Sequence, residues 1–266
     1  MIDLTFSRNQ EEVLLKEITP SQAIRYSRQI NLPKFDLDKQ ERLLAARVLI
    51  IGLGGLGCAA AQYLVASGIG MLTLVDDDEV EMSNLQRQIL HTESAVGTSK
   101  VESAQHSLQQ LSSDSDISCI QQRLDDKALS EQLEKHDMVF DCSDNLDTRN
   151  QLNRLCWQAQ IPLVSGAAIR MEGQLFCVQP HLNSACYQCL SRLFGEQNLT
   201  CSESGVMSPL VGVIGAMQAL EGIKLLTGFG TALCNELLIF DAACNQWHRL
   251  NVTKFPQCPT CASGLE

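Results

Sequence analysis

The chain has 266 residues, enough for one large domain or two small ones with a substantial buried core. Hydrophobic residues make up 45% of it, which argues against disorder. Its formal net charge of −11 argues against general binding to nucleic acid or to anionic membranes, because both need an excess of Lys and Arg.

The predicted elements begin with an N-terminal helical segment, in which Thr19 and Pro20 are a plausible N-cap and first helical position. Strands are then predicted at 47–54, 71–78, 116–124, 138–144, 162–168 and 174–180, with a late hairpin that turns at 242–246. Helices are predicted at 56–67, 100–111, 145–159 and 205–226. Alternation in the first half followed by hairpins predicts an α/β fold with a mixed, mostly parallel central sheet and helices on both faces.

The most apolar stretch is the predicted helix at 205–226. It carries Gln218, Glu221 and Lys224, and its uncharged part is short for a membrane span, so we interpret it as a buried helix at a core or subunit interface. The first twenty residues lack the pattern of a secretory signal. Twelve cysteines without such a signal indicate reduced thiols or metal ligands in a cytoplasmic protein.

A glycine-rich turn joins the first predicted strand to the helix that follows it. Gly52, Gly54 and Gly57 fit G-x-G-x-x-G, in which backbone approaches a phosphate at a helix N-terminus. Asp76 lies at the end of the next predicted strand, where a carboxylate can accept hydrogen bonds from ribose hydroxyls. These features predict a Rossmann-like fold, and by themselves they favour a NAD-dependent oxidoreductase.

Charged residues farther along favour a nucleoside triphosphate instead. Asn84, Arg87 and Lys100 follow Asp76 within one crossover, and fixed cations stabilise the charge that develops when a triphosphate is cleaved. A solvated surface pair is the alternative for the two cations. Asp144 lies at the end of the fourth predicted strand, at the same edge of the sheet, where a carboxylate near a polyphosphate requires a divalent metal such as magnesium. Capping of the next helix is the other role open to Asp144.

Two C-x-x-C pairs lie in the second half of the chain: Cys186 with Cys189, and Cys258 with Cys261. Four thiolates in two such pairs match a closed tetrahedral zinc site of structural type, and a redox-active pair is the alternative. Cys201 lies between the pairs in a polar stretch, so a reactive thiol and an incidental exposed cysteine are both open.

No repeat or flexible linker divides the sequence, so we predict a single domain over 1–266. Within it we distinguish an N-terminal helical segment (1–45), a nucleotide-binding half (46–180) and a second half with the zinc site and the late hairpin (181–266).

Five motifs and the two cysteine pairs, in this order, resemble those of the ubiquitin-activating-enzyme-like adenylyltransferases. The motifs are RYSRQI, GLGGLG, DDDEVEMSNLQRQ, VGTSK and DCSDN, and the resemblance covers about residues 21–262. The segments VSGAAIRMEGQ, CLSRLFGE and GVMSPLVGVIGAMQALEGIKLL resemble the branch that acts on the ubiquitin-like small subunit of molybdopterin synthase. The branch that acts on the sulfur carrier of thiamine biosynthesis is the alternative.

The resemblance implies that ATP with magnesium activates the C-terminal glycine carboxylate of the carrier, before a separate sulfur donor acts. It implies that the nucleotide is held by Gly54, Gly55, Asp76, Ser83, Asn84, Leu85, Gln86, Arg87, Lys100, Asp144 and Asn145. It implies catalytic roles for Arg28, Arg87, Lys100 and Asp144, with Arg28 reaching into the partner's site of a homodimer. A zinc-braced scaffold that binds a ubiquitin-like protein without catalysis is a third possibility.

Overall fold

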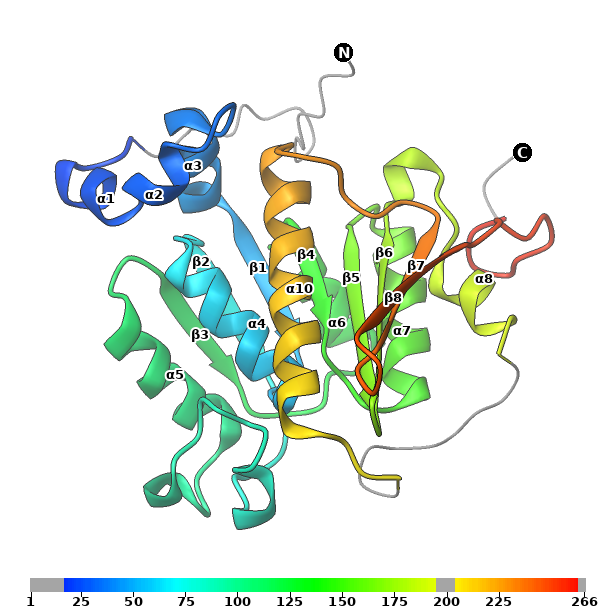
Figure 1. Cartoon of the computed structure of the whole chain (residues 1–266), viewed down its shortest axis with the longest axis horizontal. Coiled ribbons are helices and arrows are strands. Elements are labelled where there is room, and N and C mark those ends of the chain that lie inside the picture. The colour runs from blue at the N-terminus through cyan, green and yellow to red at the C-terminus, as the bar shows by residue number, and fades with distance from the viewer. Residues whose placement is uncertain (1–16, 195–203, 263–266) are drawn as a thin grey trace.

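One sheet of eight strands forms the centre of the protein (Figure 1). The computed structural model describes residues 17–194 and 204–262, so Cys201 lies outside the described residues. The strand order is β3-β2-β1-β4-β5-β6-β7-β8; β1 to β5 pair in parallel, and β5 to β8 pair antiparallel. The strands are β1 (Arg47–Ile51), β2 (Met71–Val75), β3 (Asp116–Ile120), β4 (Met138–Asp141), β5 (Leu163–Ile169), β6 (Glu172–Val178), β7 (Glu236–Asp241) and β8 (Gln246–Asn251). The predicted mixed sheet and late hairpin are confirmed.

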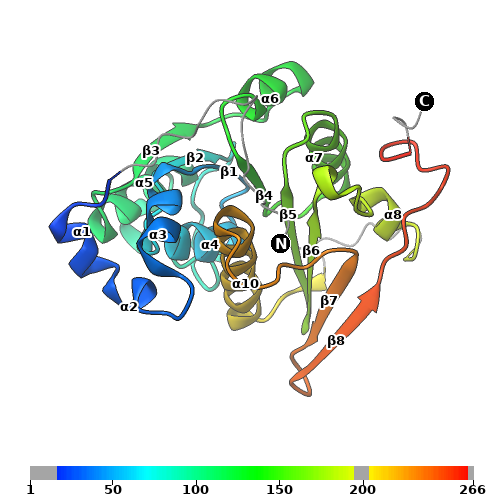
Figure 2. The same ribbon diagram turned by 90° about the horizontal axis from the view of Figure 1, so that it is seen from above.

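Helices cover both faces of this sheet, as predicted. Figure 2 shows α4 and α10 on one side of the strands, with α6 and α7 on the other. The helices are α1 (Pro20–Arg25), α2 (Ser27–Ile30), α3 (Asp36–Ala45), α4 (Gly55–Ala66), α5 (Lys100–Leu111), α6 (Asp126–Leu133), α7 (Leu146–Gln158), α8 (Tyr187–Ser191) and α10 (Ser208–Thr227).

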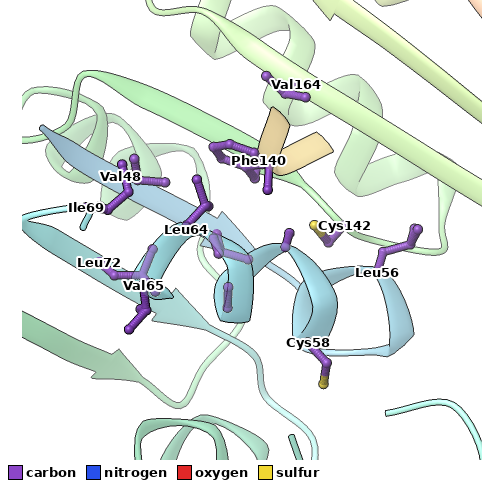
Figure 3. Packing of buried hydrophobic residues seen from close by; sticks show 14 of the residues in the cluster. Val48, Leu56, Cys58, Leu64, Val65, Ile69, Leu72, Phe140, Cys142 and Val164 are labelled. Atoms are coloured by element: carbon purple, nitrogen blue, oxygen red, sulfur yellow. The ribbon is translucent and has the colours of Figure 1, made fainter. Parts of the chain in front are cut away.

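Successive residues of the strands belong to two separate hydrophobic clusters, as expected when both faces of a sheet are covered. On β1, Val48 and Ile50 join the cluster of α4 and α10, whereas Leu49 joins that of α6 and α7. Phe140 of β4 is fully buried in the first cluster, near α4 (Figure 3). A Cβ at Gly222 of α10 would lie 2.2 Å from the Phe140 ring, so this glycine allows the close approach of helix and sheet.

Helix α10 lies in the core, as predicted for the apolar stretch. By length and composition it could also cross a membrane, but 56% of its most apolar window is buried inside the protein. Its buried polar side chains have partners: Gln218 donates to the carbonyl groups of Asp141 and Val164, and Glu221 accepts from the Leu233 amide and pairs with Lys224. The helix is therefore an internal element of this fold.

The N-terminal helical segment differs from a single continuous helix. Thr19 caps α1 as predicted, since its hydroxyl accepts from the Gln22 amide at 3.3 Å. The helix then stops at Tyr26, which is buried and donates its hydroxyl to Asp114 at 2.8 Å. The structure also contains α6, which the sequence analysis did not predict, with Asp125 as its N-cap.

Four predicted strands extend three or four residues too far at their carboxyl ends. The observed strands end at Ile51, Val75, Ile120 and Asp141, instead of at residues 54, 78, 124 and 144. The residues beyond these ends leave the sheet as turns. In open α/β sheets such turns form the ligand site, which is why strand periodicity fails at these positions.

Candidate functional site

A cavity of about 390 Å³ lies at the carboxyl ends of β1, β2 and β4. The chain leaves β1 toward α4 on one face of the sheet and leaves β4 toward α7 on the other face. The cavity therefore lies at the topological switch point, where open α/β sheets bind their ligands. The predicted nucleotide residues that line it are Gly54, Gly55, Asp76, Asn84, Arg87, Lys100, Asp144 and Asn145.

The glycine turn packs backbone against backbone with the turn that follows β4. Gly52 has φ +94°, and a Cβ there would lie 2.8 Å from the Cys142 carbonyl oxygen. A Cβ at Gly57 would lie 1.9 Å from the Gly52 oxygen. Only glycine fits these contacts, and they place the N-terminus of α4 at the cavity wall, where its amides favour an anion.

Asp76 links the ends of β1 and β2. Its carboxylate accepts hydrogen bonds from the Leu53 amide at 2.6 Å and from the Asp78 amide at 2.9 Å. Burial raises the pKa of Asp76, while the charge of Lys100 and the two amide donors oppose that rise. The carboxylate is thus held in one orientation at the edge of the cavity.

Both predicted cations, Lys100 and Arg87, line the same cavity. The Lys100 side chain is only 7% exposed, and its Nζ lies 2.7 Å from Asp78, whose side chain is 66% exposed. Arg87 donates to the Ser83 carbonyl at 3.1 Å. Because a desolvated cation interacts with a phosphate more strongly than a solvated one does, Lys100 is well placed for a polyphosphate.

Asp144 is exposed at the cavity wall and does not cap α7. The cap is Asn145, whose side-chain oxygen accepts from the Thr148 amide at 2.9 Å. The capping alternative for Asp144 is therefore wrong, and Asp144 is one of the residues that line the cavity.

Some predicted site residues do not line the cavity. Arg28 lies on α2, whose neighbour Gln29 donates to the carbonyl of Ser67 at the C-terminal end of α4. The glycine turn is at the other end of this 12-residue helix, about 18 Å away. Helix α2 thus lies at the end of α4 that is opposite to the glycine turn (Figure 1), and Arg28 does not line the cavity of its own chain. Three other predicted residues are next to lining residues in the sequence but do not line the cavity themselves: Ser83, Leu85 and Gln86.

The lining residues that the sequence analysis did not assign to the site include Gln88 and Arg123. Gln88 is 3% exposed, and its side-chain oxygen has no hydrogen-bond partner in the described part of the chain. Gln88 lies four residues after Asn84, which is about one helical turn. This spacing is the sequence signal from which Gln88 could have been assigned to the same site. Arg123 donates to the side chains of Asn145 (3.3 Å) and Thr148 (3.2 Å), but the overlong third strand concealed it.

A buried cysteine and histidine lie beneath the glycine turn. Cys58 Sγ is 3.7 Å from His91 Nε2, and His91 Nδ1 is 2.9 Å from the Ser103 hydroxyl. Burial raises the pKa of the Cys58 thiol to about 12 and lowers the pKa of His91. The thiol stays protonated at neutral pH, so this pair is unsuited to nucleophilic catalysis.

The four predicted zinc ligands form one buried cluster. The sulfur of Cys186 lies 3.9 Å from that of Cys189 and 3.5 Å from that of Cys258, and Cys189 lies 3.4 Å from Cys261. A tetrahedral Zn–S bond of about 2.3 Å requires sulfur atoms about 3.8 Å apart, so the cluster fits zinc. This geometry favours a closed structural site over a separate redox pair.

A Rossmann-like sheet with a phosphate-binding turn, two cations and a carboxylate at its switch point defines a nucleotide-binding enzyme. The model of the ThiF family matches residues 26–260, and the chain belongs to this family of nucleotidyltransferases.

Curated relatives match nearly the whole chain. It is 49% identical over 247 residues to the molybdopterin-synthase adenylyltransferase of Salmonella typhimurium, covering 93% of this chain and 99% of that protein. It is 44% identical over 241 residues to the sulfur carrier protein ThiS adenylyltransferase of Escherichia coli, covering 91% and 96%. The crystal structure of E. coli MccB with ATP superposes with a TM-score of 0.78 at 25% identity, covering 89% of this chain and 74% of that one.

Metal content tests the cysteine cluster. We expect about one zinc ion per chain in protein purified without added metal, measured by mass spectrometry of the metal. Because the metal would join residues 72 apart, Cys258→Ser should lower the free energy of unfolding by roughly 4 kcal/mol. Cys244→Ser, an exposed cysteine outside the cluster, is the control. Protein that binds no zinc would contradict the assignment.

The pH dependence of stability tests the burial of His91. The pKa of His91 is lower in the native state than in the unfolded state, so at acidic pH the unfolded chain binds more protons than the native protein does. The free energy of unfolding is therefore highest above the unfolded pKa and falls as the pH drops through the native pKa. We expect His91→Asn to reduce the loss of unfolding free energy between about pH 8 and about pH 5, measured by urea denaturation. Exposed His106→Asn should retain the wild-type dependence. An unchanged pH slope in His91→Asn would show that His91 is not the group.

Proposed function

We propose that the protein uses ATP to adenylate the C-terminal glycine carboxylate of the ubiquitin-like small subunit of molybdopterin synthase. The products are an acyl adenylate and pyrophosphate, ahead of thiocarboxylate formation in molybdenum cofactor biosynthesis. The observation that carries this proposal is the cavity itself, which combines a phosphate-binding turn, two cations and an exposed carboxylate. The names of the relatives agree with the same reaction.

The reaction needs alignment and charge neutralisation, because the attacking carboxylate is already a nucleophile. Asp76 is positioned to accept from the ribose hydroxyls, and the amides of the glycine turn are positioned for the triphosphate. As the bond between the α- and β-phosphates breaks, Arg87 and Lys100 offset the negative charge that develops.

Lys100 must exchange partners when the nucleotide binds. In the structure its ammonium pairs with Asp78, so part of its charge is already neutralised. Asp78 is largely exposed and returns to water at small cost, whereas the buried ammonium gains a phosphate partner. The pair therefore satisfies Lys100 until the substrate arrives.

Magnesium fits the oxygen-rich rim of the cavity. Asp144 supplies carboxylate oxygens at the end of β4, beside the helix cap Asn145, and the carboxylates of Asp76, Asp77 and Asp78 approach within 4.8 Å of one another at the end of β2. When bound, the ion would neutralise phosphate charge and orient the polyphosphate. We assign Asp144 to its coordination.

A homodimer would bring Arg28 to a cavity. Helix α10 presents an apolar stripe to solvent, with Val213 and Leu220 37% and 47% exposed and Met217 half-buried between them. An exposed apolar helix face of this kind suits a second copy of the chain. We infer that the dimer places Arg28 of one protomer near the phosphates bound by its partner.

Other parts of the proposal follow from the residues and the relatives. The thiamine-pathway carrier is the second candidate substrate, because the relative that acts on ThiS is 44% identical. A separate sulfur donor would convert the acyl adenylate to the thiocarboxylate. Reduced cysteines and the acidic charge favour a cytoplasmic enzyme that binds neither nucleic acid nor membranes.

Intact mass of the carrier tests the function. Each of the two candidate carriers is incubated with enzyme, ATP and magnesium, and we expect an AMP adduct on the molybdopterin synthase subunit alone. An adduct on the thiamine-pathway carrier alone would keep the chemistry and overturn the pathway. No adduct and no pyrophosphate, with thermal stabilisation by NADH instead of ATP, would favour an oxidoreductase.

The same assay tests the two cations. Arg87→Ala and Lys100→Ala should each lower the rate roughly a hundredfold, the scale expected for a lost electrostatic donor at the transition state. Lys127→Ala, on α6, should leave the rate unchanged. Losses smaller than about tenfold would count against the phosphate roles.

Mixing two inactive variants tests the dimer. Arg28→Ala and Asp144→Ala damage different protomers of each composite site, so a mixed dimer contains one intact site. We expect the mixture to regain about a quarter of wild-type activity after subunit exchange, since half of the dimers are mixed. If Arg28 acts in its own chain, mixing restores nothing. If Arg28 is only a surface residue, Arg28→Ala alone keeps wild-type activity; either result would overturn the shared site.

A further inference from the structure

A buried arginine lies beneath the turn that bears Asp144, and the mechanism above does not use it. Arg149, in the first turn of α7, is 8% exposed. Its guanidinium donates to the Ser143 carbonyl at 2.6 Å, the Gly166 carbonyl at 2.8 Å and the Ser165 hydroxyl at 3.1 Å. One side chain therefore joins α7, β5 and the turn after β4.

The counterion of Arg149 is equally buried. Asp141, the last residue of β4, is 1% exposed, and its carboxylate lies 3.6 Å from the guanidinium. The same carboxylate accepts from the amide and hydroxyl of Ser143 and from the hydroxyl of Ser165. The polar groups of this network satisfy one another, and such networks hold their members in one arrangement.

The contact with Ser143 determines where Asp144 lies. The Ser143 carbonyl belongs to the peptide group that joins it to Asp144, and Arg149 holds this group from below. Cys142, one residue earlier, lies against Gly52, so a shift of the turn would also disturb the glycine turn. The exposed Asp144 side chain is thus carried by a fixed backbone.

Arg149 also lies close to a residue that adjoins the cysteine cluster. Its guanidinium carbon lies 5.9 Å from the centre of the Tyr187 ring, and Tyr187 directly follows Cys186. Asn153, one turn farther along α7, accepts from the Tyr187 amide at 2.8 Å. The cysteine cluster therefore supports the helix that positions Arg149.

We propose that Arg149 is a positioning residue that sets the place of Asp144, and through it the affinity for the magnesium–ATP complex. This role rests on the proposed function. Lysine could retain the charge beside Asp141, but a single ammonium cannot replace the planar fork that reaches three acceptors. Arg149→Lys therefore separates position from charge.

The test is a double-variant cycle on magnesium-dependent ATP binding. Calorimetry of ATP binding over a magnesium series is measured for the wild type, Arg149→Lys, Asp144→Asn and the double variant. We expect Arg149→Lys to raise the magnesium concentration for half-maximal binding about tenfold and the double variant to be no worse than Asp144→Asn alone. Effects that multiply in the double variant, or a wild-type magnesium dependence in Arg149→Lys, would overturn the proposal.

Two further variants separate position from general stability. Arg154 lies on the same helix and pairs with the exposed Asp126. Arg154→Lys should therefore leave the magnesium dependence of ATP binding unchanged. If Arg149→Lys does not fold, Ser165→Ala is measured instead, because it removes one acceptor of the Arg149 guanidinium. Ser165→Ala should raise the magnesium concentration for half-maximal binding by less than Arg149→Lys is expected to. An unchanged magnesium concentration would overturn the proposal. Carrier adenylation by the wild type is measured in parallel. Its absence counts against the proposed function, whereas the calorimetry still decides the role of Arg149.

Discussion

The backbone contact between the turn after β1 and the turn after β4 is the constraint on which the rest of the site depends. These strands are neighbours in the sheet, and the chain leaves them toward opposite faces. Gly52 allows the turns to touch without an intervening side chain. The phosphate-binding amides and Asp144 therefore share one cavity, and the buried network around Arg149 holds the second turn in place.

The cavity combines opposite charges in a protein that is acidic as a whole. Lys100 and Arg87 lie against a rim of aspartates, and the net charge of the chain is −11. An anionic nucleotide is therefore attracted at short range by the buried Lys100 and the partly exposed Arg87, not by the overall field of the protein. The carboxylates at the rim favour a nucleotide that carries a divalent metal.

Periodicity and spacing predicted the sheet, most helices, the four cysteines that form one cluster and the residues at the strand ends. These sequence patterns failed where contacts between residues far apart in the sequence determine the local structure. Tyr26 interrupts the first helix because it packs against distant Asp114, and Arg149 looked like an ordinary polar helix residue. Arg28 could be chosen only by resemblance, because it does not line the cavity of its own chain. A local sequence pattern carries no information about contacts with residues that are distant in the sequence.

The polar side chains of helix α10 also affect whether this segment enters the protein core or a lipid bilayer during synthesis. Its Gln218, Glu221 and Lys224 all find polar partners against this sheet and the loop that follows the helix. In the hydrocarbon of a bilayer those partners would be missing, and a charged side chain such as Lys costs about 2.5–3.5 kcal/mol near the centre of a spanning helix. Three polar residues thus direct the most apolar stretch of the chain toward its own core and away from lipid.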